Sequence, residues 1–288
     1  MKKYLKEAVY GLAIGDAVGV PFEFKARDSF TCEGMTGYGT HGQAPGTWSD
    51  DTSMTLATCK SLQEKEKVDL DDLWDKFYHF LRHAKFTADH EVFDVGNTTM
   101  CTIPNRKGAT GEHSNGNGSL MRILPLAFVE DITDEQIRNV SAITHAHPIS
   151  KDACVYYVHA ANKLLELAGS SRKPAEKMQE LVNCLYADIP AESVFARVPL
   201  IAGRDRMEIK SSGYVVDTFE AAIWALLTTR NYRDCILKAV NLGSDTDTVA
   251  AVAGGLAGLI YGFEGEDGIP AEWVETLRAK KLIDSCLF

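Results

Sequence analysis

Hydrophobic positions along this chain recur mainly at helical spacing. Between positions 5 and 12 the apolar residues fall at i, i+3, i+4 and i+7, on one face of a helix. We expect this first helix to end at a Gly15-Asp16-Ala17 turn, since glycine weakens helix interiors. Residues 69–83 repeat the pattern, with apolar side chains on one side and acidic residues in the first turn, where carboxylates suit the helix dipole.

Similar periodicity predicts further helices at 150–168, 176–186, 218–227 and 232–241, whereas alternating strand patterns with hairpin turns are nearly absent. The expected fold class is therefore all-α, with many helices in a compact arrangement. No internal repeat, low-complexity tract or Pro/Ser-rich linker divides the sequence, so a single domain over residues 1–288 is the simplest prediction. Polar, glycine-rich loops at 34–46, 105–118 and 204–213 are long enough to be candidates for function.

The composition and net charge of the chain limit the kinds of partner that we expect it to bind. The 30 Lys and Arg residues against 40 Asp and Glu give a net charge of −10, which argues against stable nucleic-acid binding or attachment to an anionic membrane. No segment approaches the roughly 20 apolar residues that cross a bilayer, and no signal-peptide core follows the N-terminus. The 7 cysteines are scattered, without C-x-x-C spacing, so we expect a reducing, cytoplasmic environment.

Two acidic clusters, residues 48–52 and 243–248, carry the strongest chemical signal. Each offers two carboxylates and hydroxyl groups just before a small-residue apolar helix. Such carboxylates repel one another in a buried site unless cations neutralise them, and hard oxygen ligands suit magnesium, manganese or calcium. Ser, Thr and Asp also serve as helix N-caps, but two doubled clusters favour a metal site, with both helix starts facing a pair of ions.

Other enzyme classes lack their sequence signatures. Asp245-Thr246-Asp247-Thr248 matches the D-x-D-T of haloacid-dehalogenase-type phosphatases, but that motif should follow a strand near the N-terminus. There is no G-x-x-x-x-G-K-[ST] motif and no strand-borne G-x-G-x-x-G, which disfavours ATP hydrolysis and dinucleotide oxidoreduction. Ser119 lacks a nucleophile elbow, and Arg122 and Trp224 are expected to be structural.

Seven ordered segments resemble the ADP-ribosylglycohydrolase family, in particular its dinitrogenase-reductase-activating and ADP-ribosylarginine hydrolase-like branches. They are residues 11–23 (GLAIGDAVGVPFE), 48–52 (WSDDT), 94–98 (DVGNT), 116–122 (GNGSLMR), 144–148 (THAHP), 212–218 (SGYVVDT) and 243–248 (GSDTDT). The resemblance implies an all-α domain with a binuclear cleft that holds two Mg²⁺ (or Mn²⁺). The implied metal ligands are Ser49, Asp50, Asp51, Asp245, Asp247 and Thr248.

The same resemblance assigns the catalytic and substrate-binding residues. Hydrolysis of a glycosidic bond passes through an oxocarbenium-like state and needs a proton for the leaving group. Glu23 and Asp94 are the candidates, with the acid and base roles left open between them. The expected ADP-ribose contacts are Gly96, a diphosphate cradle, His145 and an adenine-stacking Tyr214; the cradle consists of Ser114, Asn115, Gly116, Asn117 and Gly118.

The expected activity is metal-dependent removal of ADP-ribose from a modified protein side chain, with arginine favoured by the Asp94-Val95-Gly96 segment and the short chain. The expected partners are an ADP-ribosylated protein and ADP-ribose. Alternatives are hydrolysis of serine-, nucleic-acid- or O-acetyl-linked ADP-ribose, a non-catalytic ADP-ribose-binding protein, and a two-metal phosphohydrolase. Product analysis separates the last, because it would release AMP.

Overall fold

The computed structural model describes residues 2–288, and the regular elements over that range are all helical. This confirms the all-α prediction; three isolated β-bridges are the extended pairings in the same range. Short 3₁₀ turns lie at Val20–Phe22, Gly39–His41, Leu124–Phe128, Val198–Gly203 and Arg206–Glu208. The α-helices are α1 (Lys2–Gly19), α2 (Asp50–Lys65), α3 (Leu70–His83), α4 (Asn97–Asn105), α5 (Asp134–Ala142), α6 (Pro148–Glu166), α7 (Pro174–Asp188), α8 (Val215–Leu227), α9 (Tyr232–Val240), α10 (Thr246–Tyr261), α11 (Ala271–Thr276) and α12 (Lys280–Cys286).

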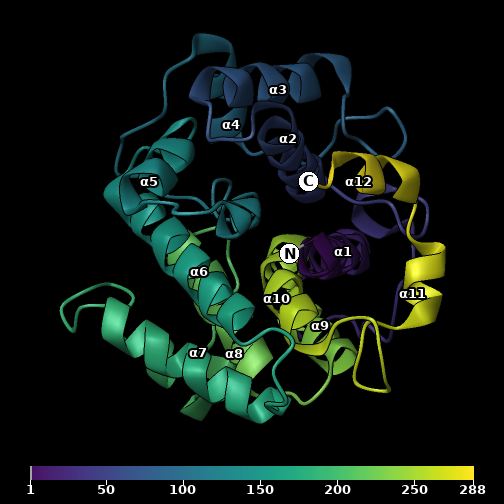
Figure 1. Cartoon of the computed structure of the whole chain (residues 1–288). Helices are drawn as coiled ribbons and strands as arrows, with labels where there is room; N and C mark the ends of the chain where they lie inside the picture. The colour runs from purple at the N-terminus through teal and green to yellow at the C-terminus, as the bar shows by residue number, and fades with distance from the viewer. Residues whose placement is uncertain (1) are drawn as a thin grey trace.

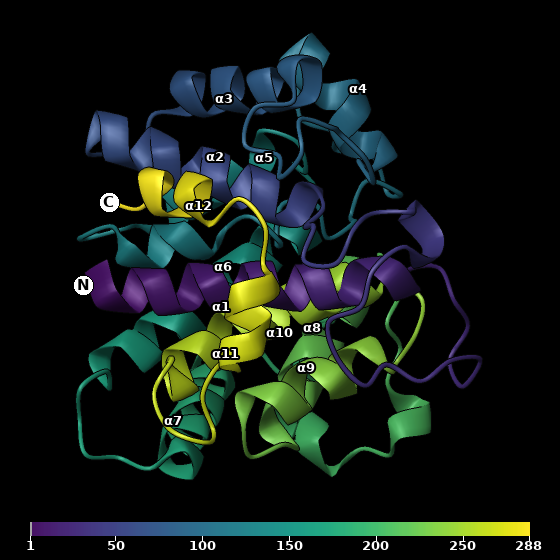
Figure 2. The same cartoon turned by 90° about the vertical axis from the view of Figure 1, so that its right-hand side faces the viewer.

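Helices α1 and α10 pack along each other at the centre of the molecule (Figure 1). Both are buried over most of their length, and the other helices surround them. In Figure 2, α1 crosses the middle, with α2 and α3 on one side and α7 and α9 on the other. The C-terminal helices α11 and α12 return to contact α1, so the two ends of the chain share one core.

The first helix is longer than predicted. The expectation that it ends at Gly15 is wrong, because α1 continues to Gly19. Its glycines at positions 11, 15 and 19 face α10, where a Cβ would overlap the backbone of Gly254, Ala250 and Asp247 respectively. These glycines therefore permit a close approach of two central helices, and the tertiary contact outweighs their low helix propensity.

The periodic segments fold as expected. Helix α3 begins after Asp69, whose side chain accepts a hydrogen bond from the Asp72 N–H at 3.0 Å and caps the helix. Helices α6, α7, α8 and α9 match their predicted ranges to within 3 residues at each end. Helices α4, α5, α11 and α12, of 6 to 9 residues, were not predicted, since such short segments carry little periodicity. No helix between residues 2 and 288 has the length and apolar character to span a membrane.

Candidate active site

The first acidic cluster lies at the start of α2, and a carboxylate of α1 holds it in place. Ser49 is the N-cap, and its side chain accepts a hydrogen bond from the Asp51 N–H. Asp16 accepts hydrogen bonds from the backbone N–H groups of Ser49 at 2.9 Å and Thr52 at 3.0 Å. It also accepts one from the Thr52 hydroxyl at 2.6 Å. Buried Asp16 thus satisfies two amides that α2 leaves unpaired and fixes the position of Asp50 and Asp51.

The second acidic cluster lies at the start of α10. Gly243 and Ser244 both have left-handed backbone, with φ of +76° and +65°, and turn the chain sharply into the helix. The Ser244 N–H donates to the Lys25 carbonyl at 2.8 Å, and the Phe24 N–H donates to the Ser244 carbonyl at 2.7 Å. This pair of hydrogen bonds joins the segment that carries Glu23 to the segment that carries Asp245 and Asp247.

The two clusters meet although they are far apart in the sequence. The hydroxyl of Thr248 donates to Asp51 Oδ2 at 3.3 Å, across 197 positions of sequence, and the Ser49 hydroxyl donates to the same oxygen at 3.1 Å. Carboxylate oxygens of Asp16, Asp51 and Asp247 lie within 4.8 Å of one another, and so do those of Glu23, Asp245 and Asp247. The helix starts therefore face each other, as the sequence predicted.

These carboxylates suit a divalent cation. Asp51 Oδ1, Asp245 Oδ1 and Asp247 Oδ2 are buried and have no hydrogen-bond partner among residues 2–288. Burial, followed by the charges of neighbouring carboxylates, raises the pKa of Asp51 and Asp247 well above the usual range. Unpaired buried oxygens and converging like charges are costly unless a cation binds them, and an all-oxygen donor set matches a hard divalent ion.

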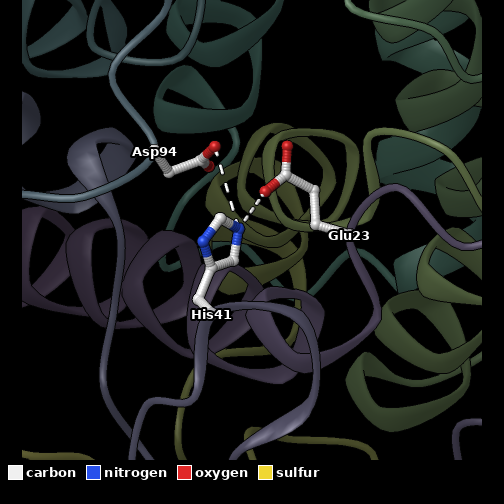
Figure 3. A group of neighbouring side chains, drawn as sticks. All are labelled: Glu23, His41 and Asp94. Carbon is white, nitrogen blue, oxygen red and sulfur yellow. Dashed lines mark hydrogen bonds and ion pairs between the residues drawn. The ribbon is translucent and has the colours of Figure 1, made fainter.

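A second group of titratable side chains stands beside this cluster. His41 Nε2 forms a short contact with Glu23 Oε2 and lies 3.8 Å from Asp94 Oδ1 (Figure 3). Burial is the main cause that raises the pKa of Glu23 to about 8 and that of Asp94 to about 7. Asp94 lies just before α4 and has a left-handed backbone conformation, with a φ of +61°. His41 was not predicted as a site residue, although it lies in the glycine-rich loop at 34–46.

A cleft of about 560 Å³ opens over both groups. Of the predicted site residues, those that line it are Glu23, Asp50, Asp94, Gly96, Gly116, Asn117, Gly118, His145, Asp245 and Thr248. Ser49, Asp51 and Asp247 are buried next to these residues and do not line the cleft. Ser114, Asn115 and Tyr214 do not line it either; the Asn115 carbonyl accepts from the Val215 N–H at 3.1 Å, and Tyr214 pairs with Gly116.

His145 offers the cleft a neutral imidazole of defined tautomer. Burial, reinforced by the charge of Arg122, lowers its pKa to about 3. Buried Arg122 donates to the Thr144 hydroxyl at 2.7 Å, and that hydroxyl lies 2.9 Å from His145 Nδ1. Because the hydroxyl needs an acceptor for its own proton, it donates to Nδ1, and Nε2 carries the hydrogen. Nε2 is thus a donor beside Gly116 and Gly118. Arg122 is buried and does not line the cleft.

Comparison with known proteins shows the family to which the chain belongs. The family model for ADP-ribosylglycohydrolase matches residues 2–287, so the chain belongs to that family. Members of the family are hydrolases that act on glycosidic bonds of ADP-ribose.

Individual relatives are similar over nearly the whole chain. The ADP-ribosylarginine hydrolase Tri1 of Serratia proteamaculans is 34% identical, with 97% of this chain and 76% of the relative aligned. Tri1 of Pseudomonas putida is 36% identical over 94% of this chain and 73% of the relative. The ADP-ribosyl-[dinitrogen reductase] glycohydrolase of Rhodospirillum rubrum is 30% identical over 95% and 90%. A solved structure described as an ADP-ribosylglycohydrolase-related protein complex superposes with a TM-score of 0.73 at 26% identity, covering 99% of this chain and 95% of that one.

Proposed function

We propose that this protein is a divalent-metal-dependent hydrolase that removes ADP-ribose from modified arginine side chains of proteins. The observation that carries the proposal is the convergence of two acidic clusters, with three buried carboxylate oxygens left unpaired, next to Glu23 and Asp94 in one cleft. The arginine linkage is supported by relatives named as ADP-ribosylarginine hydrolases that align with more than nine-tenths of the chain.

Two Mg²⁺ or Mn²⁺ ions are the proposed cofactor. The ligands would be the side chains at the two helix starts, namely Ser49, Asp50, Asp51, Asp245, Asp247 and Thr248. When bound, such ions orient ribose hydroxyl groups and lower the pKa of a coordinated water. Asn117 donates to Asp245 Oδ2 at 2.8 Å, which fixes the direction in which that carboxylate presents its free oxygen.

Glu23 and Asp94 are the proposed proton-transfer groups. Departure of the guanidine leaving group requires a proton, and attack by water requires a base on the ribose side. Both carboxyls line the cleft, and burial raises the pKa of each toward neutrality, where a carboxyl can hold or release a proton. His41 would position Glu23 through its Nε2 contact. Negative charge on these groups also stabilises the developing oxocarbenium ion.

The diphosphate is proposed to lie against the loop at residues 114–118 and His145. Gly116 and Gly118 let the ligand approach the backbone closely, and the Nε2–H of His145 would donate to a phosphate or ribose oxygen. No lysine or arginine lines the cleft among residues 2–288, so backbone N–H groups would carry most of the anion binding. Tyr214 is proposed to receive the adenine ring at the margin of the cleft.

We also propose that the chain forms a single domain and works in a reducing, cytoplasmic setting. Packing of α1 against both α10 and the C-terminal helices supports the single domain. The seven cysteines are all unpaired, which is compatible with a reducing compartment.

The test is release of ADP-ribose from arginine-, serine- and nucleotide-linked substrates, with EDTA and after addition of Mg²⁺ or Mn²⁺. The proposal expects release of intact ADP-ribose from the arginine linkage, abolished by EDTA and restored by metal. Asp245→Asn should abolish release while the protein stays folded; Asp71→Asn, at an exposed position of α3, is the matched control. Tight ADP-ribose binding without release would identify a non-catalytic reader, and AMP as product would identify a phosphohydrolase.

A further inference from the structure

Phe24 is an exposed aromatic side chain at the rim of the cleft. Its side chain lines the cleft together with Glu23 and His41, and the residue is 71% exposed, whereas the neighbouring Phe22 and Glu23 are buried. Among the large apolar residues that line the cleft within positions 2–288, Met121 is buried and Val95 half-buried. Phe24 is thus an apolar surface available to whatever enters the cleft, and the core does not require it.

The backbone holds this ring in a defined place. Phe24 has a φ of +62°, a left-handed conformation that phenylalanine rarely adopts. Its N–H donates to the Ser244 carbonyl at 2.7 Å, and the carbonyl of the preceding Glu23 accepts from the Thr40 hydroxyl at 2.6 Å. These contacts tie Phe24 to the start of α10 on one side and to the loop of His41 on the other.

The ring stands next to the carboxyls proposed to act on the leaving group. The rings of Phe24 and His41 have centroids 6.0 Å apart, and His41 in turn lies 5.2 Å from the ring of Phe93. His41 contacts the Glu23 carboxyl, which faces Asp94 across the view in Figure 3. Phe24, Glu23 and Asp94 thus line one part of the cleft, with His41 beside each of the three.

The negative charge of the carboxyls that line the cleft determines which chemical group would bind beside Phe24. Among these lining carboxyls, Asp50 and Asp245 are proposed metal ligands, whereas Glu23 and Asp94 are not. No lysine or arginine among residues 2–288 lines the cleft to offset the charge of Glu23 and Asp94. A cation is favoured near these carboxyls, and a planar guanidinium stacks on an aromatic face better than an ammonium does. Neutral hydroxyl leaving groups gain nothing from such stacking.

We propose that Phe24 is a specificity-determining residue that stacks on the guanidinium of ADP-ribosylated arginine and favours this linkage over hydroxyl-linked ADP-ribose. The proposal rests on the arginine-directed activity proposed above. It adds a contact to the leaving group, separate from the metal ligands and from the ADP-ribose contacts.

The test compares Phe24→Leu and Phe24→Tyr on ADP-ribosylated agmatine, a small guanidinium substrate. Leucine keeps apolar bulk without an aromatic face, so kcat/KM should fall by about fivefold to thirtyfold, while tyrosine should retain the wild-type value. The dissociation constant for ADP-ribose, which has no guanidinium, should be the same in all three proteins. Tyr38→Leu is the matched control, because Tyr38 is also an exposed aromatic with a positive φ of +68°, yet it does not line the cleft.

The outcomes separate this proposal from the proposed function. Wild-type kcat/KM in Phe24→Leu, or an equal loss in Phe24→Tyr, overturns the stacking role while the hydrolase activity stands. Weakened ADP-ribose binding in Phe24→Leu also overturns it, since the ring would then contact the nucleotide. Absence of release by the wild-type protein would instead contradict the proposed function. Phe24→Asn, which tolerates left-handed backbone, gives the same comparison if leucine disturbs the turn.

Discussion

Replacing Asp247 by asparagine should stabilise the metal-free protein while it destroys activity. Asp247 is fully buried, its Oδ2 has no hydrogen-bond partner among residues 2–288, and burial and neighbouring carboxylates raise its pKa. Asparagine has nearly the same shape without the charge. The substitution therefore removes repulsion from the folded state and also removes a proposed metal ligand.

The distance between carboxylates sets the size of the effect. Oxygens of Asp16, Asp51 and Asp247 lie within 4.8 Å of one another. Two unit charges at that separation repel by about 3 kcal/mol at an effective dielectric constant of ~20. In a protein of this size, a gain of about 3 kcal/mol corresponds to a rise in Tm of about 6–12 °C. Protonation relieves part of the repulsion in the wild-type protein, so the full gain requires a pH at which the cluster is ionised.

The assay is thermal unfolding in EDTA at several pH values. A carboxyl whose pKa is higher in the folded than in the unfolded state contributes stability below its unfolded pKa, and this is lost as pH rises through the folded pKa. The pKa is about 8 for Glu23 and about 7 for Asp94 in the folded protein. The metal-free wild type should therefore lose stability from about pH 4 to pH 8. Asp247→Asn should lose less, so its advantage should grow with pH.

Addition of Mg²⁺ should make the wild type more stable than Asp247→Asn. At a Mg²⁺ concentration of about 100 times Kd, the wild type should gain about 2.7 kcal/mol, whereas Asp247→Asn should gain much less. A lower Tm for Asp247→Asn than for wild type in EDTA at pH 8 would refute the reasoning. It would mean that the carboxylate is already compensated by protein groups and has no need of a cation.

Three further substitutions test other parts of the structure. Asp16→Asn should destabilise the metal-free protein by about 1–3 kcal/mol in urea unfolding at pH 5, below the pKa of about 6 to which burial raises Asp16, so that relief of charge repulsion does not offset the loss. The asparagine NH₂ group cannot accept the hydrogen bonds that one carboxyl oxygen takes from the Thr52 amide and hydroxyl, and unchanged stability at that pH would contradict this role. Gly15→Ala should cost about 1–3 kcal/mol, since a Cβ would overlap the Ala250 carbonyl, and a more stable protein would show that α1 and α10 can separate freely. Glu23→Gln should lower kcat by about 10²–10⁴-fold with Mg²⁺-dependent stabilisation intact, whereas wild-type kcat would exclude proton transfer by Glu23.

The elements that could be predicted from the sequence are those marked by a clear local pattern of apolar, capping or acidic residues. Residues 69–83 combine an apolar stripe with a capping Asp69, and the helix forms as predicted. The acidic clusters could also be interpreted from the sequence. Four carboxylates at the starts of two apolar helices are costly to bury together unless a cation binds them.

Features that depend on contacts between distant parts of the chain could not be predicted from the sequence. Gly15 has the local propensity of a helix breaker, and only the close packing of α10 shows why the helix continues through it. Asp16 lies in a recognised segment, but its use as a cap for a helix more than 30 residues away depends on the fold. His41 stands in a loop without a motif, and its contact with Glu23 follows from how that loop folds back.

The central claim is that the starts of α2 and α10 form one cation site beside the sugar. Anomalous diffraction from a crystal grown with Mn²⁺ and ADP-ribose tests it most directly. We predict manganese peaks bounded by Asp50, Asp51, Asp245 and Asp247, with a ribose against them in the cleft. Manganese peaks only elsewhere on the protein, with ADP-ribose bound in the cleft, would contradict the claim.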